Sequence, residues 1–345
     1  MKIALALAFL LPACTGADKD AVDTGSADTD TDTDSDTDTD TDSDTDTDTD
    51  TDTDTDTDTD PDTDEPTGPD FSAYDLYRGG RYFDKWYADT AFTGTFTPDS
   101  AATAGVADGV GGPSGDGTLL DADGAVVLND AGHDYRLKNF FGWDLRGTAG
   151  LYGADYANKA TALPVDLLSD TRSLADTAAW FTAGGDGLPA FGSVLSAAEI
   201  DDMAAFALAM RAGQLARASD VYDLDAAAPE SYTLHAGGNA ESGKAAYAAT
   251  CAVCHGADGT TVPVDGGEYS LGSFGRQKAY EGWLKVLVGH PGSLMEEQVP
   301  AGTGPEQGQW ILDIFAGLCD RTAFPAPAGG VDVADGDSRC GVYLL

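Results

Sequence analysis

Basic residues are scarce in this chain of 345 residues, which has 18 lysines and arginines against 60 aspartates and glutamates. The formal net charge of −42 argues against nucleic acid or an anionic membrane surface as a partner. Basic proteins and cations remain suitable partners. Histidine is also rare, and the four in the chain are too scattered for a polyhistidine metal site.

Long apolar runs are missing at the start of the chain, where residues 3–11 are too few to span a bilayer as a permanent helix. The run follows one lysine and precedes small residues, so residues 1–13 are predicted to be an export signal. Leu11-Pro12-Ala13-Cys14 resembles the bacterial lipoprotein signal, in which the cysteine becomes the lipidated first residue. An ordinary cleaved signal is the alternative. By analogy, Thr15 in place of an aspartate implies a lipid anchor in the outer membrane, facing the periplasm or the outside.

Large side chains are almost absent from residues 14–70, which are mostly a Thr-Asp alternation. The period of two mimics a strand, but neither face is apolar and like charges repel, so a disordered, extended tether is predicted. About 50 residues at roughly 3.3 Å each would reach on the order of 160 Å. Weak calcium binding and glycosylated threonines are alternatives for this segment.

The remaining sequence predicts a mainly α-helical protein with two domains, residues 71–213 and 236–318, joined by a linker over 214–235. In the first domain, an amphipathic helix is expected within 73–89, two short strands around an Asp-Gly turn within 118–128, and a helix over 174–181. The clearest helix lies within 195–213. There, Ser196 and Glu199 form a capping box and an apolar stripe follows, made of Ile200, Met203, Ala204, Ala207 and Met210.

The second domain is predicted to contain three helices. The first is capped by Asn239 and ends at Cys251, the second lies within 274–290, and the third lies within 304–319. The third has Trp310, Ile311, Ile314 and Phe315 on its buried side. The tail over 319–345 is rich in proline and glycine and suggests no regular element.

The cysteines, five in all, divide by position. Cys251-Ala252-Val253-Cys254-His255 is the C-x-x-C-H haem attachment pattern, in which two thiols bind one porphyrin and the histidine binds its iron. Two alternatives for this motif are a thioredoxin-like redox pair and half of a zinc site. A redox pair needs no following histidine, and the chain has no second C-x-x-C to complete a zinc site. Cys319 and Cys340 remain, and an exported chain permits a disulfide between them.

A second axial ligand is needed on the opposite face of the iron, and His290 and Met295 are the candidates. The stretch around Cys251 and Cys254 resembles the opening helix and haem loop of class I c-type cytochromes. Loops of that family commonly read Gly-x-Pro-Gly-x-x-Met, and Gly289 to Met295 fits this pattern. The resemblance implies that Met295 is the distal ligand, with His290 as the alternative. Glu296 stands where the family usually has proline, which implies a less rigid loop.

The first domain contains a stretch that resembles a haem site without its chemistry. Related two-domain cytochromes have Arg-Cys-x-x-Cys-His-Gly-Trp-Asp-x-x-Gly, and here residues 136–147 read Arg-Leu-Lys-Asn-Phe-Phe-Gly-Trp-Asp-Leu-Arg-Gly. Leu137 and Phe140 replace the cysteines, Phe141 replaces the histidine, and Leu188 stands where the methionine would be. The resemblance implies a cytochrome c-like domain filled by protein. An unrelated helical domain with a chance match is the alternative.

These features together predict a lipoprotein with one covalent haem c that transfers electrons between redox partner proteins in the cell envelope. An electron carrier of this kind is not an enzyme, and its acidic surface would suit basic partners. Two other classes stay open. One is a haem enzyme or sensor with a displaceable sixth ligand, and the other is a binding module, the first domain, coupled to a haem domain.

Overall fold

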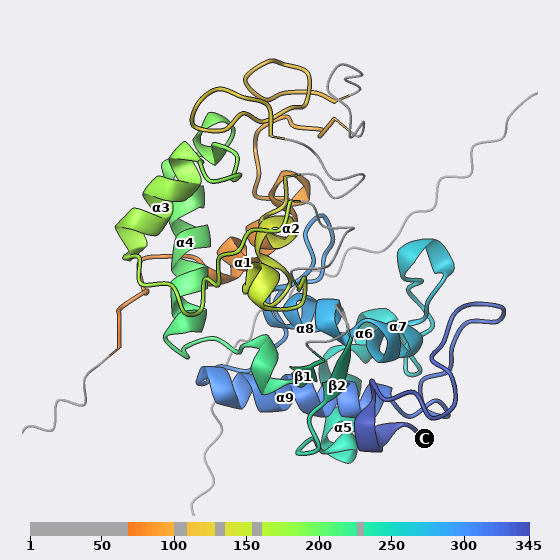
Figure 1. Cartoon of the computed structure of the whole chain (residues 1–345). Coiled ribbons are helices and arrows are strands. Elements are labelled where there is room, and N and C mark those ends of the chain that lie inside the picture. Colours follow the sequence, from red (N-terminus) through yellow and green to blue (C-terminus); the bar gives the residue numbers. More distant parts are fainter. Residues whose placement is uncertain (1–67, 100–108, 128–134, 154–160, 226–230) are drawn as a thin grey trace, which may run out of the picture. The chain divides into compact units, whose positions relative to one another are not determined.

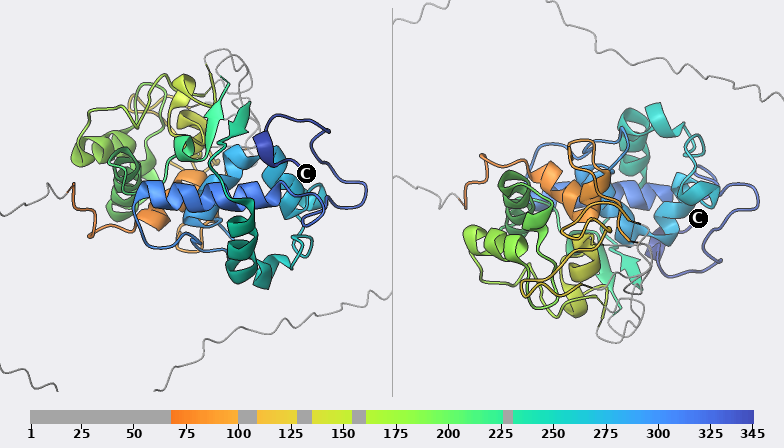
Figure 2. Two further views of the ribbon diagram at one scale, coloured as in Figure 1. Left: turned by 90° about the horizontal axis from the view of Figure 1, so that it is seen from below. Right: turned by 90° about the horizontal axis from the view of Figure 1, so that it is seen from above.

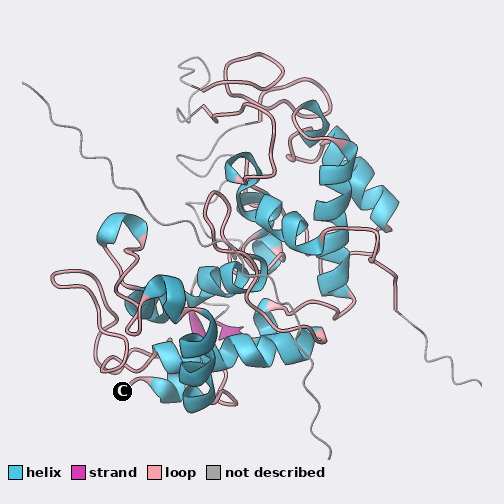
Figure 3. Ribbon diagram, turned by 180° about the vertical axis from the view of Figure 1, so that it is seen from behind, coloured by secondary structure: helices cyan, strands magenta, loops and turns pink. Residues whose placement is uncertain are grey.

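The protein is mainly helical in the computed structural model, which describes residues 68–99, 109–127, 135–153, 161–225 and 231–345 (Figure 3). The predicted signal, Cys14 and the predicted tether up to residue 67 lie outside the described residues. The helices of the described part are α1 (Leu76–Lys85), α2 (Leu137–Phe141), α3 (Leu174–Ala183), α4 (Ala197–Arg211), α5 (Ala240–Thr250), α6 (Ala252–His255), α7 (Leu271–Gln277), α8 (Ala279–Val288) and α9 (Gly304–Leu318). None of them has the length and apolar content needed to cross a bilayer.

Residues 71–213 and 236–318, here called the first half and the second half, belong to one compact unit, Thr63–Leu345. Their buried apolar side chains form one continuous hydrophobic core. Side chains from α1 and α4 meet side chains from α8 and α9 within it. The two halves are therefore packed against each other rather than joined only through the chain.

In the first half, α1 packs against α4 at very close range (Figure 1). Asp75 begins α1 by accepting a hydrogen bond from the Arg78 backbone N–H at 2.8 Å. A Cβ on Gly79 would lie 2.2 Å from the carbonyl oxygen of Asp202, so this crossing requires glycine. Tyr82 and Phe83 on α1 are fully buried. The amphipathic helix predicted for this segment is present.

The capping box predicted for α4 is also present, because Ser196 and Glu199 each bond the other's backbone N–H. The predicted apolar stripe is buried, but Phe206 and Leu208 outside it are buried too. Because α1 and α3 both pack against α4, more than one face of the helix is covered (Figure 1). A single stripe therefore understates how much of α4 is in the core.

The second half repeats this arrangement with α5 and α9 (Figure 2). Asn239 caps α5 as predicted, and Thr303 and Glu306 form a capping box at the start of α9. A Cβ on Gly243 would lie 1.7 Å from the carbonyl oxygen of Asp313. In each half, a glycine on the opening helix thus lets the closing helix approach its backbone.

One helix predicted within 274–290 is in fact two, because α7 ends at Gln277 and α8 begins at Ala279. Lys278 between them has a non-helical φ of −135° and ψ of 40°. The backbone N–H of Ala279 donates to the Tyr232 hydroxyl at 2.9 Å. Tertiary contacts therefore break a stretch whose own sequence favours a continuous helix.

The predicted linker, 214–235, contains a two-stranded antiparallel ribbon, β1 (Tyr222–Leu224) and β2 (Tyr232–Leu234). Tyr222 and Tyr232 are each 2% exposed, with ring centroids 5.3 Å apart. The Tyr232 hydroxyl donates to the carbonyl of Arg276 at 2.9 Å. This segment therefore contributes to the core instead of only connecting the halves.

Two shorter features complete the described part. The two strands expected within 118–128 reduce to one antiparallel bridge, Leu120 with Val126, around the Asp-Gly turn. The tail is fixed to the end of α9 by a disulfide between Cys319 and Cys340. Arg276 on α7 is fully buried and bonds Asp332 of the tail at 2.7 and 2.9 Å. These contacts hold a segment with little regular structure.

Candidate haem-attachment site

The C-x-x-C-H residues lie where α5 gives way to the single turn of α6. Cys251 ends α5, with its N–H donating to the carbonyl of Tyr247 at 2.8 Å. The N–H of His255 in turn donates to the carbonyl of Cys251 at 3.0 Å. Gly256 then ends the turn with a φ of 80°, a conformation that favours glycine. The local fold thus places both thiols and the imidazole on one helical turn.

Both thiols are free, with Cys251 half-buried and Cys254 exposed. Burial raises the pKa of the Cys251 thiol. A thioredoxin-like redox pair depends on a thiol whose pKa is lowered, so this environment disfavours that alternative. Among the described residues, no group of three or more His, Cys, Asp and Glu side chains is placed to hold a metal ion.

The His255 imidazole is suited to bind iron. Burial lowers its pKa, which favours the neutral form that ligates metals. Its buried Nδ1 has no hydrogen-bond partner, and neither does the buried Nε1 of Trp283 on α8. Buried polar nitrogens normally find a partner, so the unmatched imidazole nitrogen on this turn fits a group that the turn would hold. The residues present therefore fit a covalently attached haem.

Met295 and His290 lie on the turn that follows α8. Gly289 leaves the helix with a φ of 91°, and the N–H of His290 donates to the carbonyl of Met295 at 2.9 Å. The Met295 N–H donates to the Ser293 hydroxyl at 3.1 Å. Leu294 is 98% exposed, and Met295 is half-buried. The segment from Gly289 to Met295, called the distal loop below, is closed by its own hydrogen bonds.

The two candidate ligands on the distal loop differ in their surroundings. His290 Nδ1 lies 4.0 Å from Asp84 on α1, and burial together with the charge of Lys285 lowers the His290 pKa to about 4. This imidazole therefore faces the first half. Among the described residues, no ion pair or charge contact involves the Met295 side chain. The loop brings the two residues together through the His290 N–H and the Met295 carbonyl. In the described part of the chain, neither side chain makes a hydrogen bond or ion pair with α6 that would select it as the ligand.

In the first half, the stretch from Leu137 to Gly142, called the blank stretch below, ends its helical turn in the same way as the C-x-x-C-H motif. Gly142 ends α2 with φ 75° and ψ 164°, and Gly256 ends α6 with φ 80° and ψ 165°. Each glycine N–H bonds the carbonyl four residues earlier, that of Lys138 or Ala252. Counted from these glycines, Phe141 stands at the position of His255.

The side chains of the blank stretch are fully enclosed, unlike Cys254. Leu137 and Phe141 are 0% exposed, and Phe140 is 1% exposed. The Phe141 ring lies 6.3 Å from Phe83, 5.5 Å from Trp180 and 5.9 Å from Phe181, measured between centroids. Apolar side chains thus fill this part of the first half.

The two halves are also alike in the segments that come after α3 and α8. Both helices end at a glycine with positive φ, 73° at Gly184 and 91° at Gly289. Leu188 lies eight residues before the capping residue Ser196 (196 − 188), and Met295 lies eight before Thr303 (303 − 295). Leu188 is 0% exposed. The leucine and the methionine therefore share one position relative to the closing helix of each half.

A buried group of charges that the sequence analysis missed lies between the halves. Lys285 Nζ on α8 is 3.2 Å from Asp84 on α1, and Lys138 Nζ on α2 is 3.7 Å from the same carboxylate. The Trp143 ring centroid lies 3.4 Å from Lys138 Nζ and 4.8 Å from Lys285 Nζ. Burial lowers the pKa of Lys138, whereas both lysines lower the pKa of Asp84 despite its burial. One lysine within the apolar run 137–141 was the only signal of this group in the sequence.

Asp144, of the Gly-Trp-Asp match, is 2% exposed. It accepts a hydrogen bond from the Leu151 N–H at 2.8 Å. Burial raises the pKa of Asp144 to about 6, and the backbone N–H groups of Leu151 and Arg146 offset only part of that rise. Its role in the first half is to order the loop after α2.

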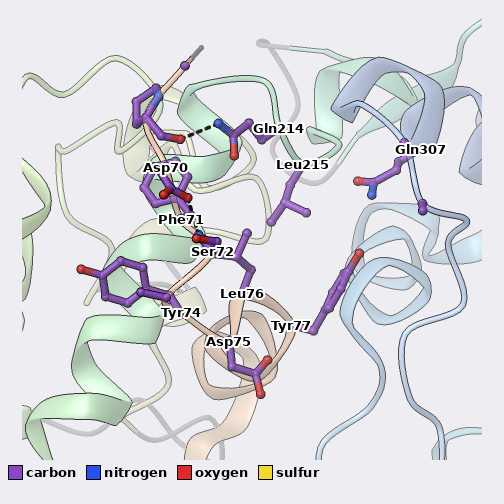
Figure 4. A pocket seen from close by; sticks show the side chains of 15 residues that line it. Asp70, Phe71, Ser72, Tyr74, Asp75, Leu76, Tyr77, Gln214, Leu215 and Gln307 are labelled. Atoms are coloured by element: carbon purple, nitrogen blue, oxygen red, sulfur yellow. Dashed lines mark hydrogen bonds between the residues drawn. The ribbon is translucent and has the colours of Figure 1, made fainter.

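A groove of about 1280 Å³ lies beside the start of α1 (Figure 4). Tyr77, Leu215 and Gln307 line it, and the Gln214 side chain donates to the carbonyl of Pro69 at 2.7 Å. These residues are separate from those that the sequence assigns to haem.

No family model, curated protein or solved structure matches this chain. Its own residues offer two functional features: the free thiols on one turn with a neutral imidazole, and a turn in the first half that ends with the same glycine conformation.

Proposed function

We propose that this protein is an electron carrier with a single covalently attached haem in its second half. The observation that carries the proposal is the turn at Cys251, Cys254 and His255, where two free thiols and a neutral imidazole with an unmatched Nδ1 lie together. Thiols at this spacing bind the two vinyl groups of one porphyrin. The haem supplies reversible one-electron chemistry when it is bound.

The residues have separate tasks in this proposal. Cys251 and Cys254 hold the group covalently, and His255 ligates the iron through its imidazole. Met295 on the distal loop completes the coordination, and thioether ligation stabilises reduced iron and raises the reduction potential. With His255 and Met295 both holding the iron, the protein would transfer electrons without binding a substrate at the metal, so it is not proposed to be an enzyme.

The first half is proposed to be a cytochrome c-like domain that has lost its haem. Support comes from the matching glycine conformations at Gly142 and Gly256 and from the glycine contacts between opening and closing helices. Phe141 and Leu188 cannot ligate iron, and between Cys14 and Cys251 there is no cysteine. The apolar side chains of Phe141 and Leu188 fill space that would otherwise be a cavity. A cavity lowers the free energy of unfolding by roughly 24 cal/mol per Å³.

The setting proposed for this carrier is the cell envelope. Lipidation of Cys14 would anchor the chain in the outer membrane, and the Thr-Asp segment would let the folded part move away from the anchor. The net charge of −42 would steer the protein towards basic redox partners and away from nucleic acid.

One observation favours a second candidate function, a haem sensor or enzyme with a displaceable sixth ligand. Leu294 is 98% exposed beside Met295, and Glu296 follows where related cytochromes have proline. A loosely held Met295 would open the iron to small ligands. Rapid binding of carbon monoxide to the ferrous protein would favour this function, and slow or absent binding would favour the carrier.

The test of the proposal is haem content measured with the ferrous and ferric absorption spectra. We expect one haem for each full-length chain exported by a host that attaches haem, and none in Cys251→Ala/Cys254→Ala. Met295→Ala should abolish the weak sulfur-to-iron band near the red end of the ferric spectrum, whereas His290→Ala should leave it intact. Two haems per chain, or none, would refute the proposal.

A further inference from the structure

The last turn of α8 packs against α1 of the first half. A Cβ on Gly80 would lie 2.4 Å from Val288 Cγ1, so the two helices are in direct contact there. Arg81 Nη1 donates to the carbonyl oxygen of Val288 at 3.3 Å. That oxygen immediately precedes Gly289, where the distal loop begins. The first half therefore supplies a hydrogen bond to the base of the loop.

A second link holds the same turn of α8 by charge. Lys285 Nζ lies 3.2 Å from Asp84, which sits one helical turn after Gly80 on α1. The side chain of Asp84 is 3% exposed and that of Lys285 is 16% exposed. Breaking a pair this well buried leaves an uncompensated charge, which is strongly unfavourable. Lys285 also bonds Glu281 at 3.1 Å within α8, a contact that does not involve the first half.

A third contact reaches the distal loop itself. Gly292 has a φ of +76°, and a Cβ there would lie 2.9 Å from the carbonyl oxygen of Ala88. Ala88 ends the 3-10 turn, Trp86–Ala88, that follows α1. The segment from Val288 to Gly292 therefore contacts the first half at both of its ends.

We infer that the first half positions the distal loop, with Arg81, Asp84 and Lys285 as positioning residues for the axial ligand of the second half. This inference rests on the proposed function, because it assumes that the loop presents Met295 to iron. The described loop residues bond mainly to one another, through the His290 N–H to Met295 and the Ser293 hydroxyl. The first half anchors that closed loop from outside.

The physical consequence concerns how often the loop opens. A loop held at its base by a buried ion pair and a backbone hydrogen bond opens less often than one held only by its own bonds. Loss of either anchor should increase the open population. Because Met295 can leave the iron only when the loop moves, the same loss should weaken its ligation. A haem-free half would then be retained because it tunes the haem of its neighbour.

The experiment compares Lys285→Met and Arg81→Gln with the matched control Glu281→Gln, all as full-length, haem-loaded proteins. Lys285→Met takes a cation from both Asp84 and Glu281 and leaves Asp84 with Lys138 as its remaining cation, whereas Glu281→Gln removes only the partner of Lys285 that lies on α8 itself. Amide hydrogen exchange of peptides covering residues 289–298 is measured together with the ferric sulfur-to-iron band and the reduction potential.

Exchange over 289–298 should be at least about tenfold faster in Lys285→Met and in Arg81→Gln, with a weaker band and a lower potential. Glu281→Gln should match the wild type in all three readouts. If Lys285→Met does not fold, Arg81→Gln decides alone, because it removes the hydrogen bond to Val288 and leaves the Asp84–Lys285 pair in place. The same variant also removes the ion pair between Arg81 and Asp89, which lies within the first half.

The outcomes separate the inference from the proposal beneath it. A wild-type protein that has the sulfur-to-iron band, with exchange and band unchanged in both variants, refutes the positioning role and leaves the carrier function intact. A wild-type protein without that band refutes ligation by Met295, and the inference falls with it. Faster exchange with a weakened band in both variants, but not in the control, supports it.

Discussion

Replacing Phe141 by alanine tests whether protein has taken the place of haem in the first half. The ring is 0% exposed and meets three aromatic rings with centroids between 5.5 and 6.3 Å away. Truncation of a buried phenylalanine costs about 3–5 kcal/mol, and the lost aromatic contacts place this site in the upper part of that range. For a domain of this size, about 4 kcal/mol corresponds to a fall of roughly 8–16 °C in Tm.

The assay is denaturation by guanidinium chloride, followed by far-ultraviolet circular dichroism and by tryptophan fluorescence. Phe141→Leu should lose clearly less than Phe141→Ala, because it leaves a smaller cavity. Val342→Ala is the matched surface control, since Val342 is 71% exposed, and it should change stability by no more than about 0.5 kcal/mol. Haem content should stay at one per chain in every variant.

Two results would refute this reasoning. A loss below about 1 kcal/mol in Phe141→Ala would mean that the ring does not support the core of the first half. A second haem bound noncovalently by the variant would mean that the first half still has a haem cavity, with Phe141 acting only as its plug. The Phe141→Leu variant separates these cases, because it keeps the site apolar and mostly filled.

Two further predictions concern Asp144 and the tail. Because the folded state raises the pKa of Asp144 to about 6, the native protein binds a proton that the unfolded chain has already released. The free energy of unfolding should therefore fall by up to about 3 kcal/mol as pH rises from 4 to 6, and Asp144→Asn should lack this contribution; the same slope in wild type and variant would contradict the assignment. Cys319 and Cys340, 21 residues apart, should resist alkylation in the intact exported protein, and their mutation to serine should cost about 3 kcal/mol. Ready labelling of both thiols would argue against the bond.

Helix boundaries were predictable where the sequence carries its own signal. The capping box at Ser196 and Glu199 and the cap at Asn239 are local patterns, since both partners lie within three residues of each other. The break at Lys278 was not predictable from the local sequence, because the N–H of the next residue, Ala279, bonds the Tyr232 hydroxyl, 47 residues away along the chain. Local propensity favours one helix there, and a tertiary hydrogen bond overrides it.

The candidate site divides in the same way. C-x-x-C-H is a contiguous pattern whose spacing encodes its chemistry, so Cys251, Cys254 and His255 could be named from the sequence. The Asp84–Lys285 pair joins residues 201 positions apart, and no periodicity links them. The ribbon within 214–235 did leave a signal, the alternation around Tyr222 and Tyr232, but three-residue strands are too short to separate from a linker by pattern.

The continuous core that joins the halves has a thermodynamic consequence. Side chains from α1 and α4 share one apolar cluster with side chains from α8 and α9, so neither half can lose its structure without exposing apolar surface on the other. Unfolding should then be cooperative across residues 71–318, as a single transition with one midpoint. The colour of a haem bound in the second half would in that case report the melting of the half that has none.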